Sequence, residues 1–449
     1  MKITSVDIFL LRHVGEEFSP FPFRPAVCRV NTDEGICGYG EAGISVGTGE
    51  NGVAYMLKDL SQLVLGKDPM NNEVIWEDIH NVLRGHLSGG GVTVYSAMSA
   101  LDTAMMDIKG KKLGVPIYVL LGGKHRDKLK CYLSQCHLGY LDDYRLQATI
   151  QQLADTCAKI QKDGYPAVKF NAVAFDEQAK PLPREMTTGP LGKTVLDLAE
   201  SRLAAVRERC GDQLGIILEN LCGTDVTAAV QLERIARKYG VLMIEEATSN
   251  FNPALYGEIA RRVETPLATG ERFHTRWGFE QLLKQGAISV IQPDITNCGG
   301  LSEAKKICDL AHIYDVRVQC HVAGTPIAEA AAIQLEAAIP NFYIHETYHM
   351  AAHPDCVSYG KYAYVPENGY LTVPDLPGLG RSFLTRPWRN RWDISRSDKV
   401  TNFLRYRPCR AWQLQIRCDG NLPQASAPNR KNADGGSGVD RMIITLVNS

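Results

Sequence analysis

The stretch that decides the fold runs from Gly215 to Glu271 and reads GIILENLCGTDVTAAVQLERIARKYGVLMIEEATSNFNPALYGEIARRVETPLATGE. It contains three short apolar runs, at 215–219, 242–245 and 267–271, and a helix-length segment follows each of the first two. Alternation of this kind is typical of parallel strands joined by crossover helices. Each run ends in a glutamate, and the spacing between these glutamates is 26 positions in both steps.

The same pattern begins near residue 128 and continues to about residue 346. Eight candidate strands can be placed at 130–134, 167–170, 215–219, 242–245, 267–271, 290–294, 316–321 and 342–346. Eight strand–helix units in about 220 residues match the size of a (β/α)8-type barrel, in which catalytic residues lie at the C-terminal ends of the strands. We therefore predict an α/β fold of this type, with a doubly wound open sheet as the alternative.

The residues before the barrel predict a smaller α+β unit. A strand at 2–9 and a hairpin at 26–41 precede three helical patterns, at 52–66, 73–85 and 92–112. We predict a capping domain at 1–125 and a barrel at 126–383, whose end could return to the capping domain. Residues 384–449 have no clear period and include a Gly/Ser/Asn-rich stretch, so we expect a poorly ordered tail.

Composition narrows the classes of partner. The chain has 449 residues, 45% apolar and 22% charged, with a formal net charge of −1, so no broad field favours nucleic acid or an anionic membrane. A small-molecule substrate is the better expectation. The thirteen cysteines form no C-x-x-C pairs, and neither a signal-like start nor an apolar run of about 18 residues is present. We expect a cytoplasmic protein, and a homo-oligomer is the usual state of a soluble enzyme.

Three carboxylates in equivalent positions on neighbouring strands predict a metal site. Glu219, Glu245 and Glu271 would converge at the mouth of the barrel, where they must bind a cation or repel one another. A set of oxygen ligands suits a hard ion such as Mg²⁺. The alternative is that these acids cap helices or lie on solvated loops, but helix capping requires no fixed spacing.

Two further strand ends carry a possible acid/base pair. Asp294 and His321 end consecutive candidate strands, so the carboxylate could hydrogen-bond one imidazole nitrogen and leave the other facing a substrate. Lys169 near the end of the second strand would supply a cation opposite them. A single histidine of this kind is more often structural, and the neighbouring acids are what favour catalysis here.

The order of these residues resembles the enolase superfamily, and within it the mandelate racemase subgroup. The resemblance covers about residues 1–380 and rests on Lys169-Phe-Asn171, Glu219, Glu245-Glu246, Gly270-Glu271, Gln292-Pro-Asp294, His321 and His345-Glu346. It implies Mg²⁺ bound by Glu219, Glu245 and Glu271, an acid/base dyad of His321 and Asp294, and Glu346 near an enediolate oxygen.

Departures from the family pattern bear on the reaction. The racemase has a second lysine where this chain has Asn171, and relatives with Lys-x-Asn are sugar-acid dehydratases, the galactonate dehydratases among them. The resemblance thus implies a hydro-lyase of carbohydrate acid catabolism, with Asn171 contacting a sugar-acid substrate. A racemase or epimerase, a cycloisomerase and an inactive metal-binding relative are the alternatives. Leu221 stands where relatives can carry a histidine, so the acid that protonates the leaving hydroxyl stays open, and His321 is a candidate for both steps. Glu219 stands where aspartate is usual, and its extra methylene is expected to shift the metal.

Two motifs favour other functions but lack the required context. Residues 38–43 fit the G-x-G-x-x-G dinucleotide fingerprint, yet they end a hairpin instead of joining a strand to a helix. Residues 345–349 fit the H-E-x-x-H zinc motif, yet they follow the eighth strand and precede a proline. Substrate specificity is expected from the capping-domain segments 14–25, 43–52 and 88–91.

Overall fold

A computed structural model describes residues 1–10, 25–43, 49–86, 90–141, 143–349, 351, 364–380 and 391–395, and all of them belong to one structural unit, Met1–Arg396. Most of the tail predicted at 384–449 lies outside the described residues. So do residues 14–24, 44–48 and 88–89, which make up most of the segments expected to set specificity.

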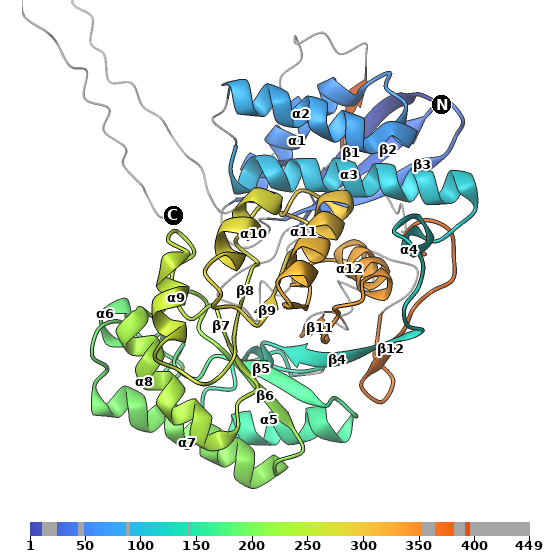
Figure 1. Ribbon diagram of the computed structural model, residues 1–449. Helices are drawn as coiled ribbons and strands as arrows, with labels where there is room; N and C mark the ends of the chain where they lie inside the picture. The colour runs from blue at the N-terminus through green and yellow to red at the C-terminus, as the bar shows by residue number, and fades with distance from the viewer. Residues whose placement is uncertain are drawn as a thin grey trace, which may run out of the picture. The chain divides into compact units, whose positions relative to one another are not determined.

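Eight parallel strands form the central sheet, as the sequence predicts (Figure 1). They are β4 (Lys128–Ser134), β5 (Ala167–Phe170), β6 (Gly215–Glu219), β7 (Met243–Glu245), β8 (Leu267–Thr269), β9 (Val290–Ile291), β10 (Arg317–Val318) and β11 (His345–Tyr348). Their order is β10-β9-β8-β7-β6-β5-β4-β11, and β11 pairs in parallel with β4. Val318 exchanges backbone hydrogen bonds with Asn341 and Tyr343, just before β11, so the sheet closes on itself. The barrel-type prediction is confirmed, because an open doubly wound sheet has a different strand order.

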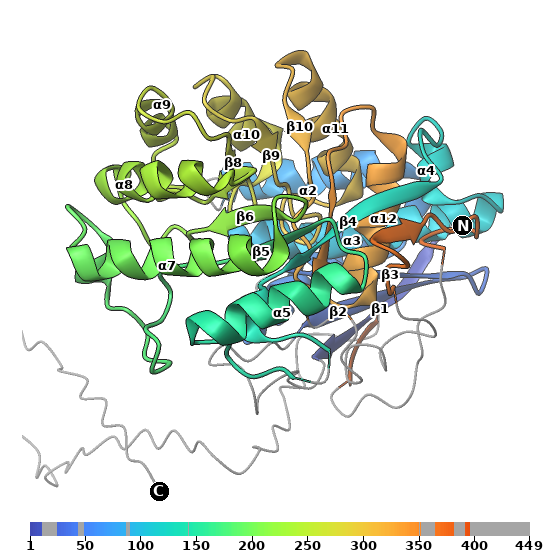
Figure 2. The same cartoon turned by 90° about the horizontal axis from the view of Figure 1, so that it is seen from below.

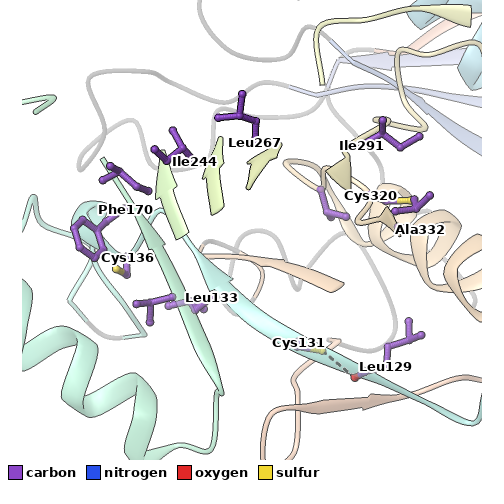
Figure 3. Close-up of a cluster of buried hydrophobic side chains, with 14 of the residues drawn as sticks. Leu129, Cys131, Leu133, Cys136, Phe170, Ile244, Leu267, Ile291, Cys320 and Ala332 are labelled. Carbon is purple, nitrogen blue, oxygen red and sulfur yellow. Dashed lines mark hydrogen bonds between the residues drawn. The ribbon is translucent and has the colours of Figure 1, made fainter. Parts of the chain in front are cut away.

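Helices cover the outside of this sheet (Figure 2). They are α5 (Ile150–Lys162), α6 (Arg184–Thr187), α7 (Lys193–Cys210), α8 (Val226–Ala236), α9 (Ala254–Ala260), α10 (Thr275–Leu283), α11 (Leu301–Ile313) and α12 (Pro326–Ala338). Outward-facing strand residues such as Leu133, Phe170 and Ile244 pack against them in the largest apolar cluster (Figure 3).

The alternate residues of the same strands face the barrel interior. Ile217, Met243 and Ala268 belong to a second, smaller apolar cluster inside the barrel. Since side chains alternate with a period of two, the residues two positions after Ile217 and Met243 also face inward. Those residues are Glu219 and Glu245, so local strand geometry alone aims both carboxylates into the barrel mouth.

The N-terminal residues form an antiparallel sheet covered by helices. Strands β1 (Ile3–Leu10), β2 (Ala26–Thr32) and β3 (Cys37–Ala42) pair in sequence, and helices α1 (Glu50–Val64), α2 (Asn72–His86) and α3 (Val92–Leu113) follow. Figure 1 shows α3 running along the α10–α12 side of the barrel, with α1 and α2 on the other side of α3. Helix α3 is buried along almost its whole length, as expected for a helix packed on two sides.

The chain after the barrel returns to the N-terminal unit. Strand β12 (Tyr370–Thr372) pairs antiparallel with β4, and Gly378 exchanges backbone hydrogen bonds with Val115 and Ile117, next to the short helix α4 (Ile117–Leu120). Strand β13 (Arg391–Ser395), within the segment predicted as a tail, pairs with β1. The domain boundaries at 125 and 383 stay predictions. No helix in the described ranges is long and apolar enough to span a membrane.

Candidate metal and acid/base site

Three predicted metal ligands meet at the C-terminal ends of β6, β7 and β8. One carboxylate oxygen each from Glu219, Glu245 and Glu271 lies within 4.8 Å of the other two. All three side chains are buried. The fixed spacing in the sequence therefore corresponds to real proximity, and an all-oxygen donor set of this size suits a hard divalent cation.

Lys169 lies among these carboxylates. Its Nζ is 2.8 Å from Glu346 and 3.3 Å from Glu219, and it also donates a hydrogen bond to Glu245. Burial by itself opposes the lysine charge, but Glu245 and Glu346 outweigh burial and raise the pKa of Lys169 well above its ordinary value. The lysine is thus held as a cation in a site with an excess of negative charge.

The environment of Glu219 shows why a further cation would stabilise these carboxylates. Its Oε1 accepts a 2.7 Å hydrogen bond from the backbone N–H of Leu221, whereas its buried Oε2 has the Lys169 ammonium at 3.3 Å and no hydrogen bond. Burial, and then the charge of Glu245, raise the pKa of Glu219 well above its ordinary value. A divalent ion would remove this penalty, so the three carboxylates fit a bound metal.

His321 and Asp294 form the predicted pair. His321 Nδ1 is 2.8 Å from Asp294 Oδ2, and the other Asp294 oxygen accepts hydrogen bonds from the backbone N–H and hydroxyl of Thr296. The carboxylate requires the proton on Nδ1, which leaves Nε2 facing the site, 3.4 Å from Glu271. Burial lowers the pKa of His321, but Glu271, Glu346 and Asp294 outweigh it and raise the pKa well above its ordinary value.

Glu346 faces the same interior from β11. One of its oxygens accepts the backbone N–H of Val322 at 2.9 Å. Burial would raise its pKa, but Lys169 and then His321 lower the pKa of Glu346 to about 2. Glu346 is therefore ionised and links the lysine to the loop that follows His321.

Comparison with known proteins agrees with this geometry. Residues 152–385 match the enolase C-terminal domain-like family, and residues 24–122 match the N-terminal domain of mandelate racemase and muconate lactonizing enzyme. The chain belongs to the enolase superfamily, in its mandelate racemase subgroup.

Individual relatives span most of this superfamily member. A crystal structure of an enolase superfamily member from Salmonella Typhimurium is 42% identical, with a TM-score of 0.82 over 88% of this chain and 99% of that chain. A D-galactonate dehydratase from Xanthomonas euvesicatoria pv. vesicatoria is 32% identical over 78% of this chain and 87% of its own length. A D-galactarolactone cycloisomerase from Agrobacterium fabrum is 30% identical over 85% and 96%.

Asn171 is the one predicted site residue without a described contact to the acids. Its Oδ1 accepts the backbone N–H of Val173 at 2.9 Å, and its own N–H points to His137 Nδ1 at 3.5 Å. Leu221 has a left-handed backbone, with φ of +48°, and is partly exposed. Its side chain has no proton to give to a leaving group.

Sequence reasoning gave no role to several polar residues that support the acids. Gln292 donates to Glu245 Oε2 at 2.6 Å and to Gln319 Oε1 at 2.5 Å. Arg272 bridges Glu246 Oε2 at 2.8 Å and Glu271 Oε1 at 3.0 Å. The sequence feature that could have identified these residues is their position at, or just after, the end of a strand. Because many strand ends carry polar residues, that position alone selects no partner.

Neither of the two competing motifs has the structure that its function needs. Residues 38–43 lie largely in antiparallel β3, where a Cβ on Gly38 or Gly40 would lie 2.0 or 1.9 Å from a carbonyl oxygen of α3. These glycines therefore allow close packing of β3 on α3. His345 to Tyr348 form strand β11, and His345 Nδ1 contacts Glu336 of α12 at 2.6 Å. The zinc motif requires a helix at this position.

Proposed function

We propose that this protein is a Mg²⁺-dependent sugar-acid dehydratase, a hydro-lyase that removes the proton next to a carboxylate and eliminates the 3-hydroxyl. The observation that carries the proposal is the cluster of Glu219, Glu245 and Glu271 beside the His321–Asp294 pair. Family membership and the dehydratase relative support the same reaction class. A cytoplasmic location and a homo-oligomeric state are part of the proposal.

Glu219, Glu245 and Glu271 would hold the metal ion. Once bound, Mg²⁺ supplies positive charge that stabilises the negative charge developing on the substrate carboxylate as the α proton leaves. Among the residues that the structure describes, the permanent cations paired with these ligands are Lys169 and Arg272. Lys169 would add a second positive charge on the carboxylate side of the substrate, and Glu346 keeps that lysine protonated and oriented.

His321 would act as the base through Nε2, with the cation held by Glu271 and the other ligands offsetting the carboxylate charge that raises its pKa. Asp294 accepts the Nδ1 proton, which fixes the tautomer and the plane of the ring and raises its basicity. The C2–H bond breaks, its electron pair forms the C2–C3 double bond, and the 3-hydroxyl leaves with a proton as water. The resulting enol tautomerises to a 2-keto-3-deoxy acid, so the net change is loss of one water.

The proton for the leaving hydroxyl also comes from His321 in this proposal. Leu221 has no acidic group, and His321 carries the C2 proton immediately after the first step. One imidazole would then serve both transfers, which requires removal of the proton and loss of the hydroxyl on the same face of the substrate. Asn171 would contact the sugar hydroxyls, since it follows Lys169 by two positions.

A cycloisomerase is the second candidate. It is favoured by the D-galactarolactone cycloisomerase relative, which matches nearly its whole length. A cycloisomerase would use the same abstraction of an α proton but would release no water. A racemase that uses two bases is less well supported, because Asn171 cannot accept a proton in place of a second lysine.

The test is to incubate the protein and Mg²⁺ with a set of aldonic and aldaric acids and their lactones, and to measure 2-keto acid. We expect a 2-keto-3-deoxy acid from at least one aldonic acid, and no product with the His321→Asn variant. Isomerisation of a lactone without 2-keto-3-deoxy product would replace the proposal by the cycloisomerase. Mg²⁺ binding without 2-keto acid or lactone isomerisation would identify an inactive relative or a racemase or epimerase, and a change of optical rotation without loss of water would distinguish the latter.

A further inference from the structure

The two loops that follow Asp294 and His321 are both held by buried carboxylates of the N-terminal unit. Residues 295–300 lead from Asp294 to α11, and residues 322–325 lead from His321 to α12. Each of these helices begins with backbone N–H groups that have no partner within the helix. In both helices, a carboxylate that is distant in the sequence accepts hydrogen bonds from some of these N–H groups.

Asp102 of α3 caps helix α11. Its Oδ2 accepts the Ser302 backbone N–H at 2.9 Å, and its Oδ1 accepts the Ser302 hydroxyl at 2.9 Å and the Asn72 amide at 3.0 Å. The carboxylate is 1% exposed. Gly300 just before the helix has φ of +98°, and a Cβ there would lie 2.6 Å from Asp102 Oδ2. The loop is thus built to admit this carboxylate.

Glu41 of β3 caps helix α12 in the same way. Its two oxygens accept the Thr325 backbone N–H at 3.1 Å each, the Thr325 hydroxyl at 2.6 Å and the Ala328 N–H at 3.3 Å. The side chain is 3% exposed. Burial raises the pKa of Glu41, and the nearby charge of Asp294 adds to that effect. Glu41 binds the residue that lies four positions after His321.

Further contacts join the same loops to the N-terminal unit. The Gly43 N–H donates to the Thr296 carbonyl at 2.7 Å. Ser99 accepts the Gly299 N–H at 2.9 Å, and the Trp76 indole donates to the Gly299 carbonyl at 2.8 Å. Thr296 is itself the residue whose N–H and hydroxyl bind Asp294. A continuous path of hydrogen bonds therefore runs from the N-terminal unit to the dyad carboxylate.

We propose that Glu41 and Asp102 are positioning residues, which set the mutual geometry of His321 and Asp294 by fixing the loops behind them. The expected effect on turnover rests on the proposed function, whereas the expected effect on the geometry of the dyad does not. A displacement of about 1 Å in a catalytic group can cost about 100-fold in rate, so two helix caps next to the dyad can matter more for rate than for stability.

The structural half of the test needs no substrate. In protein labelled with ¹⁵N-histidine, the His321 Nδ1–H resonance is assigned by its absence in His321→Asn. We expect Glu41→Gln and Asp102→Asn to shift or broaden this resonance, because an amide NH₂ would face the donors that the carboxylate accepts. Asp107→Asn is the matched control. Asp107 is a fully buried α3 carboxylate that accepts the N–H groups of Leu379 and Tyr39 and touches neither loop.

The kinetic half separates positioning from folding. We expect kcat to fall about 10- to 100-fold in Glu41→Gln and Asp102→Asn with KM changed less than about threefold, whereas Asp107→Asn lowers the Tm and leaves kcat unchanged. Unchanged resonance and kcat in both loop variants would overturn the proposal. An equal fall of kcat in Asp107→Asn would do so too.

Two milder variants cover the case in which a buried amide prevents folding. Ser302→Ala and Thr325→Val each remove one hydroxyl donor to Asp102 or Glu41 and keep the carboxylate and its backbone bonds. They also remove the acceptor of the Asn72 amide and of the Ile327 N–H, respectively. We expect smaller changes in the same resonance and in kcat, and no change in either would contradict the proposal. If the wild-type protein dehydrates no sugar acid, the proposed function fails, while the His321 resonance still decides whether the loops are positioned by these caps.

Discussion

Two groups of buried acidic residues lie on opposite sides of β11, and they differ in the positively charged side chains that surround them. The mouth cluster consists of Glu219, Glu245, Glu246, Glu271 and Glu346, which share the permanent cations Lys169 and Arg272. The α12 cluster consists of Glu329 and Glu336 around His345. Adjacent residues of one strand, His345 and Glu346, thus belong to different environments, because strand side chains alternate in direction.

The α12 cluster places one histidine between two carboxylates. Glu336 accepts the Cys320 N–H at 2.9 Å and contacts His345 Nδ1 at 2.6 Å, and His345 Nε2 lies 3.8 Å from Glu329. Burial lowers the pKa of His345, but Glu336 and Glu329 outweigh it and raise the pKa to about 10. The mouth cluster has five carboxylates for its two permanent cations, a larger excess of negative charge than two carboxylates around one histidine. Similar residues therefore make a structural ion pair in one place and the proposed cation site in the other.

The largest expected difference between the clusters concerns metal binding. Glu219→Gln should weaken Mg²⁺ binding by more than about 100-fold and lower turnover by at least a similar factor, since it removes a direct ligand. Without metal, the same variant should raise the Tm, because it removes a charge that burial and Glu245 disfavour. Calorimetric titration with Mg²⁺, the 2-keto acid assay and thermal melts measure the three effects. Equal Mg²⁺ affinity in Glu219→Gln and Glu336→Gln would contradict the assignment of Mg²⁺ binding to the mouth cluster.

The two histidines give the next contrast. His321→Asn should lower turnover by about 10²- to 10⁴-fold, because the base is lost, with a small change in Tm. His345→Asn should lower the free energy of unfolding by about 3–5 kcal/mol, because it leaves Glu329 and Glu336 without their cation. Chemical denaturation and turnover, measured on both variants, should show opposite patterns. A large stability loss in His321→Asn alone would contradict the assignment of the two clusters.

The pH dependence of stability should reveal the α12 cluster. Since the pKa of His345 is raised to about 10 in the folded protein from an ordinary 6.5, its stabilisation is fully present below pH 6.5. It is lost as pH rises through 10, with a slope of at most about 1.4 kcal/mol per pH unit. Denaturation at pH 7 and 9.5 should show a larger loss in the wild type than in His345→Gln. Burial raises the pKa of the nearby Cys131 and Cys320, so these thiols also lower stability above their ordinary pKa of about 8.5, but they do so in both proteins and the difference between the two isolates His345.

The smallest effect is expected at a solvent-exposed ion pair. Lys193 and Asp197 lie 2.6 Å apart at an i,i+4 spacing on α7, with side chains 85% and 55% exposed. Asp197→Asn should change the free energy of unfolding by less than about 0.5 kcal/mol and leave turnover unchanged. The same denaturation experiment provides the measurement. A change as large as that of His345→Asn would mean that burial does not explain the difference between the clusters.

Local periodicity made much of the barrel predictable. All eight strands and the helices α1, α2 and α3 overlap the ranges expected from apolar patterns. The convergence of Glu219, Glu245 and Glu271 was predictable because they recur at the ends of consecutive strand–helix units, and neighbouring parallel strands end side by side. The alternation of side chains along β6 and β7 then decides that two of these acids face inward.

The partners of those acids were not predictable in the same way. Arg272 could equally have pointed to solvent, and only the left-handed backbone of Glu246, with φ of +49°, brings that carboxylate to it. The glycines at 38 and 40 fit a nucleotide motif by letter, and their contact with α3 decides against it. Strand β13 was missed because nothing in residues 391–395 shows that they pair with β1.

The sequence by itself determined the order of the strands, the spacing of the three converging glutamates and the histidine–aspartate pair, because these follow from repeats of short range. Only the tertiary structure decided which buried acids share a cation and which residues hold the dyad loops. Asp102 and Ser302 are 200 positions apart, and Glu41 and Thr325 are 284 apart. Contacts at such separations depend on how whole helices and sheets dock, and no local pattern of polar and apolar residues encodes that docking.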